Sequence, residues 1–285
     1  MSVKKNVWIN GQFLDSAYPV LPINNRAFQY GDGLYETIHA FGTEPKHLEK
    51  HLKRIKKGMQ ILEIEEPGIL NEDYIFKTIE KLLNKNRYFN STQVRLTVFR
   101  KATSPTHLKS EAEIVIEAEP LNYKFYKYNE TGLQVNVYSE IKKPVNMLSI
   151  VKSCNSLLQV KAELYSKVNN LDDCIIINEF DRIVETIRSN IFVVKENNLF
   201  TPSLAEGCIP GVMREIVCET APELGLKVNS QVAVTPKALK NSDEVFIAND
   251  IEGIKWILGI GDKRYFNTWS KKLSEAINKS TFGLV

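Results

Sequence analysis

The 285-residue sequence contains only four cysteines, and no two of them have CxxC spacing. This scarcity excludes a small disulfide framework and indicates reduced thiols, as in the cytosol. The ordinary interpretation is that they are small side chains in or near a core. The four residues are Cys154, Cys174, Cys208 and Cys218.

Long apolar runs and an excess of one charge are also missing. No stretch approaches the roughly 18–20 apolar residues of a membrane-spanning helix. The first residues lead directly into a strand-like segment, without the apolar core of a signal peptide. A formal net charge of +3 without a basic block gives no sign of nucleic-acid or membrane-surface binding. We therefore expect a cytoplasmic protein that binds neither.

The remaining composition is that of an ordinary globular protein, with 43% apolar and 25% charged residues. A chain of this length can bury a substantial core and form two modest domains. Residues 47–62 and 71–86 have apolar side chains three and four positions apart, which predicts amphipathic helices. We also predict a hairpin turning at Asn10-Gly11, and strands at residues 35–41, 93–99 and 113–118.

Residues 121–130 are polar and aromatic without a helical stripe, so we predict a linker there. It would join a small N-terminal domain, residues 1–120, to a C-terminal domain, residues 131–285. The mixed order of helices and strands predicts the α+β class. Further along the chain we expect helices at residues 155–168, 211–224 and 267–278, and strands at residues 132–139, 174–177, 183–185, 191–194, 198–200 and 244–248.

The sequence Pro210-Gly211 predicts the start of a helix whose first turn could bind an anion. The first backbone N–H groups of a helix lack partners within the helix and lie at the positive end of its dipole. Pro210 fits the first turn, and Gly211 would let a ligand approach the backbone closely. Ordinary helices often start in this way, so the interpretation depends on neighbouring residues.

Two charged residues could act together with such an anion site. Glu185 lies in an apolar strand, where a carboxylate is costly to bury without a cation, unless it faces water at a strand edge. Lys152 has apolar neighbours that suit Schiff-base chemistry, although most lysines are solvated. A ligand that uses all three features would have a cationic ring for Glu185, a phosphate for the helix and a group that bonds covalently to Lys152. Pyridoxal phosphate has all three.

Laid end to end, these segments resemble the class IV aminotransferases, the fold-type IV pyridoxal-phosphate enzymes. That family includes branched-chain and D-amino-acid aminotransferases and aminodeoxychorismate lyase. The resemblance covers nearly the whole chain. It is carried by residues 8–11 (WING), 26–37 (RAFQYGDGLYET), 51–54 (HLKR), 152–157 (KSCNSL), 185–214 and 243–246 (DEVF).

The resemblance implies a two-domain α+β fold, with a small N-terminal domain and a larger, β-rich C-terminal domain, and a homodimer. It implies that Lys152 forms the internal aldimine with the cofactor and then moves the proton as general base and acid. Glu185 would pair with the ring nitrogen and Ile209 would pack on the ring face. The other cofactor-binding residues that it implies are Arg54 and the backbone N–H groups of Val212 and Met213, all three at the phosphate, and Asn249 in a late turn.

This chain departs from the family pattern in that late turn. The family often has Thr or Ser there, touching the phosphate, where this chain has Asn249 and Asp250. An acid beside a phosphate would be repulsive, so we expect the Asp250 side chain to point away and only backbone contacts to remain.

Four residues are candidates for contact with the substrate. The resemblance places Tyr35 and Arg95 there. His39 shares the strand face of Tyr35 and could touch the substrate, or it could be an ordinary core or surface histidine. Arg188 is unexpected so close to the ring; it could bind a substrate carboxylate or point out of the pocket.

The expected reaction is transfer of an amino group from an amino acid, of branched-chain type, to a 2-oxo acid. One alternative keeps the cofactor and eliminates pyruvate from aminodeoxychorismate, which the cations Arg95 and Arg188 would favour. A remote alternative is a non-catalytic binding protein on the same fold. His47 and His51 have a spacing that can bind zinc, but no HExxH glutamate accompanies them, so we expect no metal site.

Overall fold

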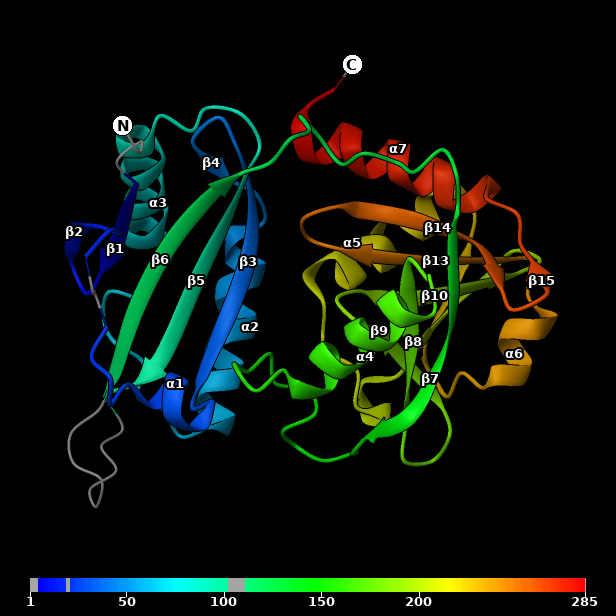
Figure 1. The fold of residues 1–285 in the computed structure, drawn as a ribbon. Coiled ribbons are helices and arrows are strands. Elements are labelled where there is room, and N and C mark those ends of the chain that lie inside the picture. The colour runs from blue at the N-terminus through cyan, green and yellow to red at the C-terminus, as the bar shows by residue number, and fades with distance from the viewer. Residues whose placement is uncertain (1–4, 19–20, 102–110, 285) are drawn as a thin grey trace. The chain divides into compact units, whose positions relative to one another are not determined.

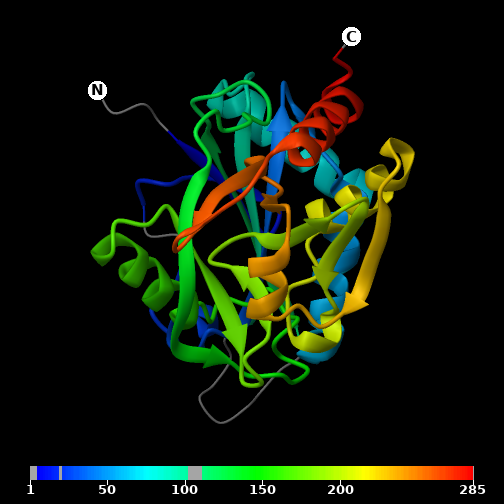
Figure 2. The same ribbon diagram turned by 90° about the vertical axis from the view of Figure 1, so that its right-hand side faces the viewer.

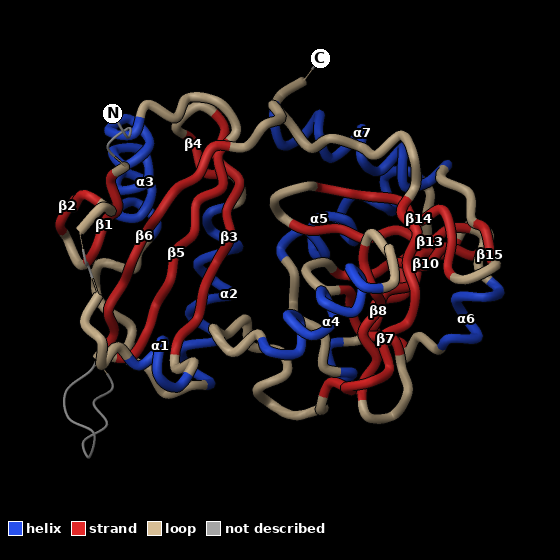
Figure 3. Tube along the Cα trace, in the orientation of Figure 1, coloured by secondary structure: helices blue, strands red, loops and turns tan. Residues whose placement is uncertain are grey.

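The computed structural model describes residues 5–18, 21–101 and 111–284. The chain divides into two compact units, Met1–Phe125 with Val151–Asn155, and Tyr126–Ile150 with Ser156–Val285. Each unit contains a sheet and helices, in agreement with the predicted α+β class (Figures 1 and 3). The second unit begins inside the predicted linker 121–130. Residues 151–155, with Lys152, lie in the first unit and not with the C-terminal part of the chain.

The first unit is built on a 6-stranded antiparallel sheet in the order β2-β1-β6-β5-β3-β4, counted over its described residues. The predicted hairpin is present: Asn10 and Gly11 have φ of 45° and 99°, as two-residue hairpin turns require. The strands of this sheet are β1 (Asn6–Ile9), β2 (Gln12–Asp15), β3 (Gly33–Phe41), β4 (Glu44–Pro45), β5 (Thr92–Arg100) and β6 (Ala112–Pro120).

Two amphipathic helices, α2 (Leu48–Ile61) and α3 (Glu72–Asn86), share one core with this sheet. Asn71 caps α3, because its side chain accepts a hydrogen bond from the Tyr74 N–H at 3.0 Å. Both helices confirm the prediction from apolar spacing. A short helix, α1 (Arg26–Tyr30), was not predicted; it ends at Gly31, whose φ is 67°.

The segment Val151–Asn155 runs beside the start of β3. The Tyr35 N–H donates to the Lys152 carbonyl at 3.1 Å, and the Cys154 N–H donates to the Gly33 carbonyl at 2.8 Å. Val151 is buried in the core of the first unit. The backbone on both sides of Lys152 is therefore fixed against β3.

The second unit is built on a 9-stranded mixed sheet in the order β12-β11-β10-β13-β14-β7-β8-β9, with β15 beside β14. β9 also pairs with β10 through Glu185 and Asn190, so part of this sheet closes on itself. Its strands are β7 (Leu133–Lys143), β8 (Asp173–Asn178), β9 (Ile183–Thr186), β10 (Asn190–Lys195), β11 (Asn198–Pro202), β12 (Lys227–Val232), β13 (Glu244–Asn249), β14 (Gly253–Ile260) and β15 (Lys263–Arg264).

Alternate residues of β10 and β13 enter two different cores, as strand periodicity requires. Phe192 and Phe246 stack with ring centroids 4.9 Å apart in one core, while Ile191 and Ile247 belong to the other. These strands are buried on both faces, which explains their continuous apolar sequences.

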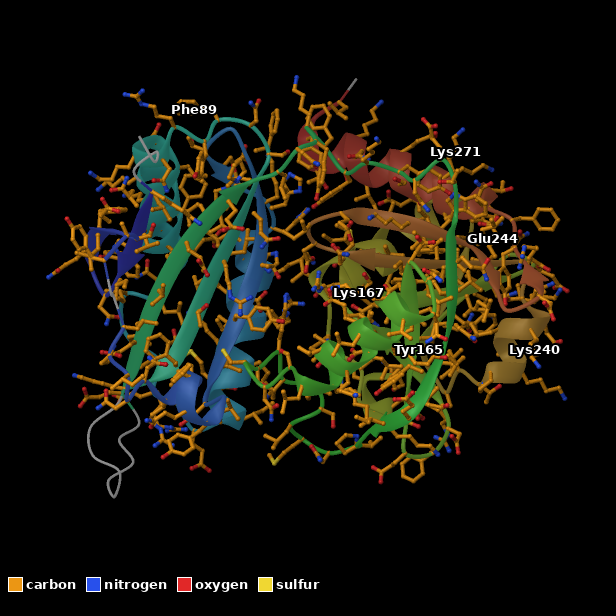
Figure 4. All side chains as sticks on the ribbon, in the orientation of Figure 1. Phe89, Tyr165, Lys167, Lys240, Glu244 and Lys271 are labelled. Carbon is orange, nitrogen blue, oxygen red and sulfur yellow. The ribbon has the colours of Figure 1, made fainter. Side chains whose placement is uncertain are left out.

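Helix α7 (Thr268–Phe282), red in Figures 1 and 2, packs on the first of these cores through Leu273 and Ile277. The carboxylate of Glu244, labelled in Figure 4, is buried and accepts hydrogen bonds from the N–H groups of Trp269 and Ser270 at 2.9 and 3.2 Å. A carboxylate at the N-terminus of a helix satisfies unpaired donors and the helix dipole. The remaining helices of this unit are α4 (Leu157–Val168), η1 (Leu204–Glu206), α5 (Val212–Thr220), η2 (Ala221–Leu224) and α6 (Pro236–Asn241).

The helix predicted at residues 211–224 is correct in its extent but not in its continuity. α5 ends at Thr220 and a 3₁₀ turn continues to Leu224, where Gly225 with φ of 92° terminates it. Pro222 has no N–H to donate to the preceding turn, so it interrupts the α-helical hydrogen bonds. Strand β14 and helix α6 were not predicted.

Cys174 and Cys208 are buried, and burial raises the pKa of each thiol to about 11. Both are unreactive core side chains at neutral pH. Within the residues that the structure describes, no helix is long and apolar enough to cross a membrane.

Candidate active site

In the first unit, the amine of Lys152 lies against alternate residues of β3. Its Nζ donates to the Thr37 hydroxyl at 2.7 Å and lies 5.0 Å from the centroid of the Tyr35 ring. Tyr35 and Thr37 are two positions apart and therefore point to the same face of the sheet. The sequence pattern singled out Tyr35 and Lys152 but missed Thr37, although its position two residues after Tyr35 could have revealed it.

Arg95 extends this cluster from the neighbouring strand β5, where it is paired with Thr37 in the sheet register. Its guanidinium carbon lies 3.8 Å from the Tyr35 ring centroid, a cation–π contact, and its Nε is 3.9 Å from the Glu117 carboxylate. An amine, a phenol and a guanidinium thus meet on one face of the sheet. Such a set can hold a carboxylate beside an amine that accepts and returns a proton.

Arg54, the predicted phosphate ligand, pairs with the buried carboxylate of Glu36. Its Nε donates to Glu36 at 2.8 Å, and its terminal nitrogen also donates to that carboxylate. His51 Nδ1 lies 2.8 Å from the same carboxylate. Burial raises the pKa of Glu36, but the Arg54 charge and the hydrogen bonds from Arg54 and His51 outweigh it and hold the pKa well below its usual value.

Two of the three histidines considered from sequence, His51 and His39, are bound within the first unit. Among the described residues, no group of His, Cys, Asp and Glu has the arrangement of a metal site, and His51 belongs to the Glu36 cluster. His39 is 1% exposed, with its Nε2 at 2.8 Å from the Ser91 hydroxyl and its ring against Tyr123. Its burial argues against the expected substrate contact and for the alternative of a core histidine.

In the second unit, the buried carboxylate of Glu185 on β9 already has a cation. Lys143 Nζ donates to its Oε1 at 2.6 Å, and the Ile209 N–H donates to its Oε2 at 2.8 Å. The side chains of Lys143 and Glu185 are 7% and 6% exposed. The sequence correctly indicated that a carboxylate in this strand needs a cation. It missed Lys143, because the lysine lies at the end of a distant strand, β7.

Gly211 has a different role from the expected one. A side chain there would place its Cβ 1.9 Å from the amide oxygen of Asn190, so glycine makes room for a residue of the protein itself and not only for a ligand. The Asn190 amide nitrogen donates to the Ile209 carbonyl at 2.8 Å. Asn190 therefore ties the end of β9 and the start of β10 to the loop before α5.

The expectation for Asp250 was wrong, because its side chain does not point away from α5. Its Oδ1 accepts a hydrogen bond from the Met213 N–H at 2.7 Å, and the residue is 8% exposed. Met213 is in the first turn of α5, so the chain places its own carboxylate at the helix N-terminus where we expected a phosphate.

Asn249 and Arg188 both have partners within the second unit. Asn249 holds its own turn: its Oδ1 accepts from the N–H groups of Ile251 and Glu252, and its amide donates to Ser189 at 3.0 Å. The Arg188 side chain is 75% exposed and pairs with Glu163 at 2.7 Å. It takes the alternative we left open, an arginine directed to solvent.

Each unit has residues that fit one end of pyridoxal phosphate. In the first unit Lys152 offers an amine for its aldehyde. In the second unit Glu185 offers a buried carboxylate for its ring nitrogen, although both carboxylate oxygens already accept hydrogen bonds, from Lys143 and from the Ile209 N–H. The phosphate end fits less well, because Arg54 and the Met213 N–H both hold carboxylates of the protein.

Comparison with known proteins gives a consistent answer. The sequence profile described as amino-transferase class IV matches residues 33–257. A Methanocaldococcus jannaschii protein provisionally named branched-chain-amino-acid aminotransferase is 28% identical over 284 residues, 96% of this chain and 93% of the relative. Aminodeoxychorismate lyase of Vibrio harveyi is 26% identical over 259 residues, 89% of this chain and 90% of the relative.

Solved structures show the same fold. The branched-chain aminotransferase of Thermoproteus uzoniensis, solved with norvaline, has a TM-score of 0.87 at 22% identity and covers 98% of this chain and 95% of its own. A structure from Legionella pneumophila assigned as 4-amino-4-deoxychorismate lyase has a TM-score of 0.82 at 20% identity, over 93% and 96% of the two chains. These likenesses confirm the predicted fold-type IV architecture. Because the family profile spans well over half of the sequence, the chain belongs to the class IV aminotransferases.

Proposed function

We propose that this chain is a pyridoxal-phosphate-dependent aminotransferase that moves an amino group from an amino acid of branched-chain type to a 2-oxo acid. The observation that carries the proposal is the Lys152 amine, held at 2.7 Å from Thr37 on a sheet face that also presents Tyr35 and Arg95. Bound pyridoxal phosphate supplies an aldehyde for the amino group and a ring that accepts the electrons left when the α-proton departs.

The roles of the residues follow from their surroundings. Lys152 is the covalent anchor, and its Nζ then takes the proton from the substrate α-carbon and returns it to the cofactor. Thr37 accepts a hydrogen bond from this amine and orients it. Glu185, buried, pairs with the ring nitrogen, and Arg95 binds the substrate carboxylate.

The exposure of Arg188 favours the transaminase over the lyase alternative. We associated elimination of pyruvate from aminodeoxychorismate with two cations, Arg95 and Arg188. Arg188 is 75% exposed and paired with Glu163, whereas Arg95 lies against Tyr35 in the cluster around Lys152. Arg95 can bind the single α-carboxylate of a branched-chain amino acid. A relative with the branched-chain name supports the same choice, although a lyase is among the relatives too.

The proposal is tested by product analysis with the holoprotein. L-leucine or L-valine with 2-oxoglutarate should yield the branched 2-oxo acid and glutamate, measured by mass spectrometry. The Lys152→Ala protein should yield neither, while Lys161→Ala, which removes an exposed lysine of α4, should keep the activity. Pyruvate released from aminodeoxychorismate, without transfer from amino acids, would replace the proposal by the lyase. No product from either would leave a binding protein.

Homodimer formation and a cytoplasmic location complete the proposal, the first supported by the family resemblance and the second by the cysteine usage. Light scattering of the purified protein tests the homodimer. A single-chain mass would contradict it.

A further inference from the structure

We infer that Asp250 is an internal anion that competes with the phosphate group of the cofactor for the N-terminus of α5, so that phosphate adds little to cofactor affinity in this chain. The inference rests on the proposed function, because it concerns how the same cofactor is held. Its starting point is the 2.7 Å hydrogen bond from the Met213 N–H to Asp250 Oδ1.

The position of Asp250 is built into its turn. β13 ends at Asn249, whose side-chain oxygen accepts hydrogen bonds from the N–H groups of Ile251 and Glu252 at 2.9 and 2.8 Å. Gly253, with φ of 73°, follows at the start of β14. The turn between two paired strands therefore directs Asp250 to α5, and the carboxylate is almost wholly buried there.

A carboxylate in this place does what a bound anion would do. It satisfies an unpaired N–H of the first helical turn and lies at the positive end of the helix dipole. A phosphate dianion could use the Met213 N–H only after Asp250 had left it or taken up a proton, because two like charges on one donor repel each other.

The other predicted phosphate ligand shows the same feature within its own unit. Arg54 donates two hydrogen bonds to the buried carboxylate of Glu36. Each of these two anion-binding groups thus holds a carboxylate of the protein. The aldehyde, served by Lys152, is then expected to contribute most of the affinity.

The test compares pyridoxal phosphate with pyridoxal, which lacks the phosphate, in equilibrium binding to the apoprotein followed by absorbance. We expect the wild-type protein to bind the two with dissociation constants within about tenfold of each other, about 1.4 kcal/mol. Asp250→Ser should tighten pyridoxal phosphate at least about tenfold and leave pyridoxal unchanged. Asp250→Asn keeps an acceptor for the Met213 N–H but removes the charge. It should also tighten the binding of pyridoxal phosphate, by a smaller factor than Asp250→Ser. Asp262→Asn removes an exposed carboxylate and should match the wild type.

A second readout needs no cofactor. Inorganic phosphate should raise the melting temperature of the Asp250→Ser protein and leave that of the wild-type protein unchanged. The inference is overturned, and the proposed function left standing, if the wild-type protein strongly prefers pyridoxal phosphate and both Asp250 variants keep that preference. Binding of neither compound by any of these proteins would overturn the proposed function and this inference with it.

Discussion

Lys143 Nζ lies 2.6 Å from Glu185 Oε1, and both side chains are buried. This pair places a lysine beside the carboxylate that we assign to the cofactor ring. In an apolar environment neither charge is stable alone, since removing one partner leaves an uncompensated buried ion.

Replacing Lys143 should therefore destabilise the protein strongly. We expect Lys143→Met to lower the free energy of unfolding by about 3–5 kcal/mol, measured by urea denaturation. The double variant Lys143→Met/Glu185→Gln should lose clearly less than the sum of the two single losses, because it has no unpaired charge. Lys195→Met breaks an ion pair whose side chains are 50% and 41% exposed and should leave the free energy of unfolding almost unchanged. Strictly additive losses would show that Lys143 and Glu185 do not interact.

The Glu36 carboxylate, which Arg54 and His51 contact, predicts that the free energy of unfolding falls in acid. The pKa of Glu36 in the folded protein is held far below the ordinary value of 4.5. As the pH falls, the unfolded chain therefore takes up the proton first. The stabilisation is complete above about pH 4.5 and is lost progressively as the pH falls toward the folded-state pKa.

Glu36→Gln should flatten this dependence of the free energy of unfolding on pH below 4.5, because it removes the titrating group. Glu119→Gln, at an exposed surface pair with Lys5, serves as the control and should keep the wild-type slope. Urea titrations at a series of pH values measure these slopes. Equal slopes for wild type and Glu36→Gln would contradict the assignment.

Gly211 is predicted to accept a side chain only at a cost in stability while Asn190 is present. In Gly211→Ala the new Cβ would overlap the Asn190 amide oxygen and break its bond to Ile209, at a cost of about 1–3 kcal/mol, read from thermal unfolding. Gly68→Ala, which has nothing within 4 Å of its new Cβ, should be nearly neutral. The double variant Gly211→Ala/Asn190→Ala should lose less free energy of unfolding than the sum of the two single losses. Full additivity would argue against the overlap.

Thr37 is expected to position the Lys152 amine without taking part in bond making. Thr37→Val removes the hydroxyl but keeps the shape, so we expect kcat to fall about tenfold with little change in KM, the loss of about one hydrogen bond. Thr37→Ser keeps the hydroxyl and should recover most of the rate. An unchanged kcat in Thr37→Val would remove Thr37 from the proposal.

The sequence predicted most of the framework because local patterns determine it. Apolar spacing located α2 and α3, and the Asn10-Gly11 pair located the first hairpin. β14 was missed because its apolar and polar residues do not alternate, and its burial follows no period of two. The apolar spacing predicted one continuous helix over residues 211–224, because it does not register that Pro222 ends the α-helical hydrogen bonds.

The site was predictable where one residue carries a role, and not where a pair does. The family resemblance, carried by residues 152–157 and 185–214, singled out Lys152 and Glu185, which their own neighbours alone did not. The partners Thr37 and Lys143 are 115 and 42 residues away, so that only the fold brings them together. The case of Asp250 is similar. Charge repulsion from an expected phosphate predicted that its side chain points away, whereas the turn fixed by Asn249 directs it to the Met213 N–H.

The most direct test of the central claim, that Lys152 is the covalent anchor of pyridoxal phosphate, is peptide mass mapping after borohydride reduction of the holoprotein. The account predicts the reduced cofactor on the peptide that contains Lys152, and no attachment in the Lys152→Ala protein. Attachment to Lys143 or another lysine, or no attachment to the wild-type protein, would contradict it.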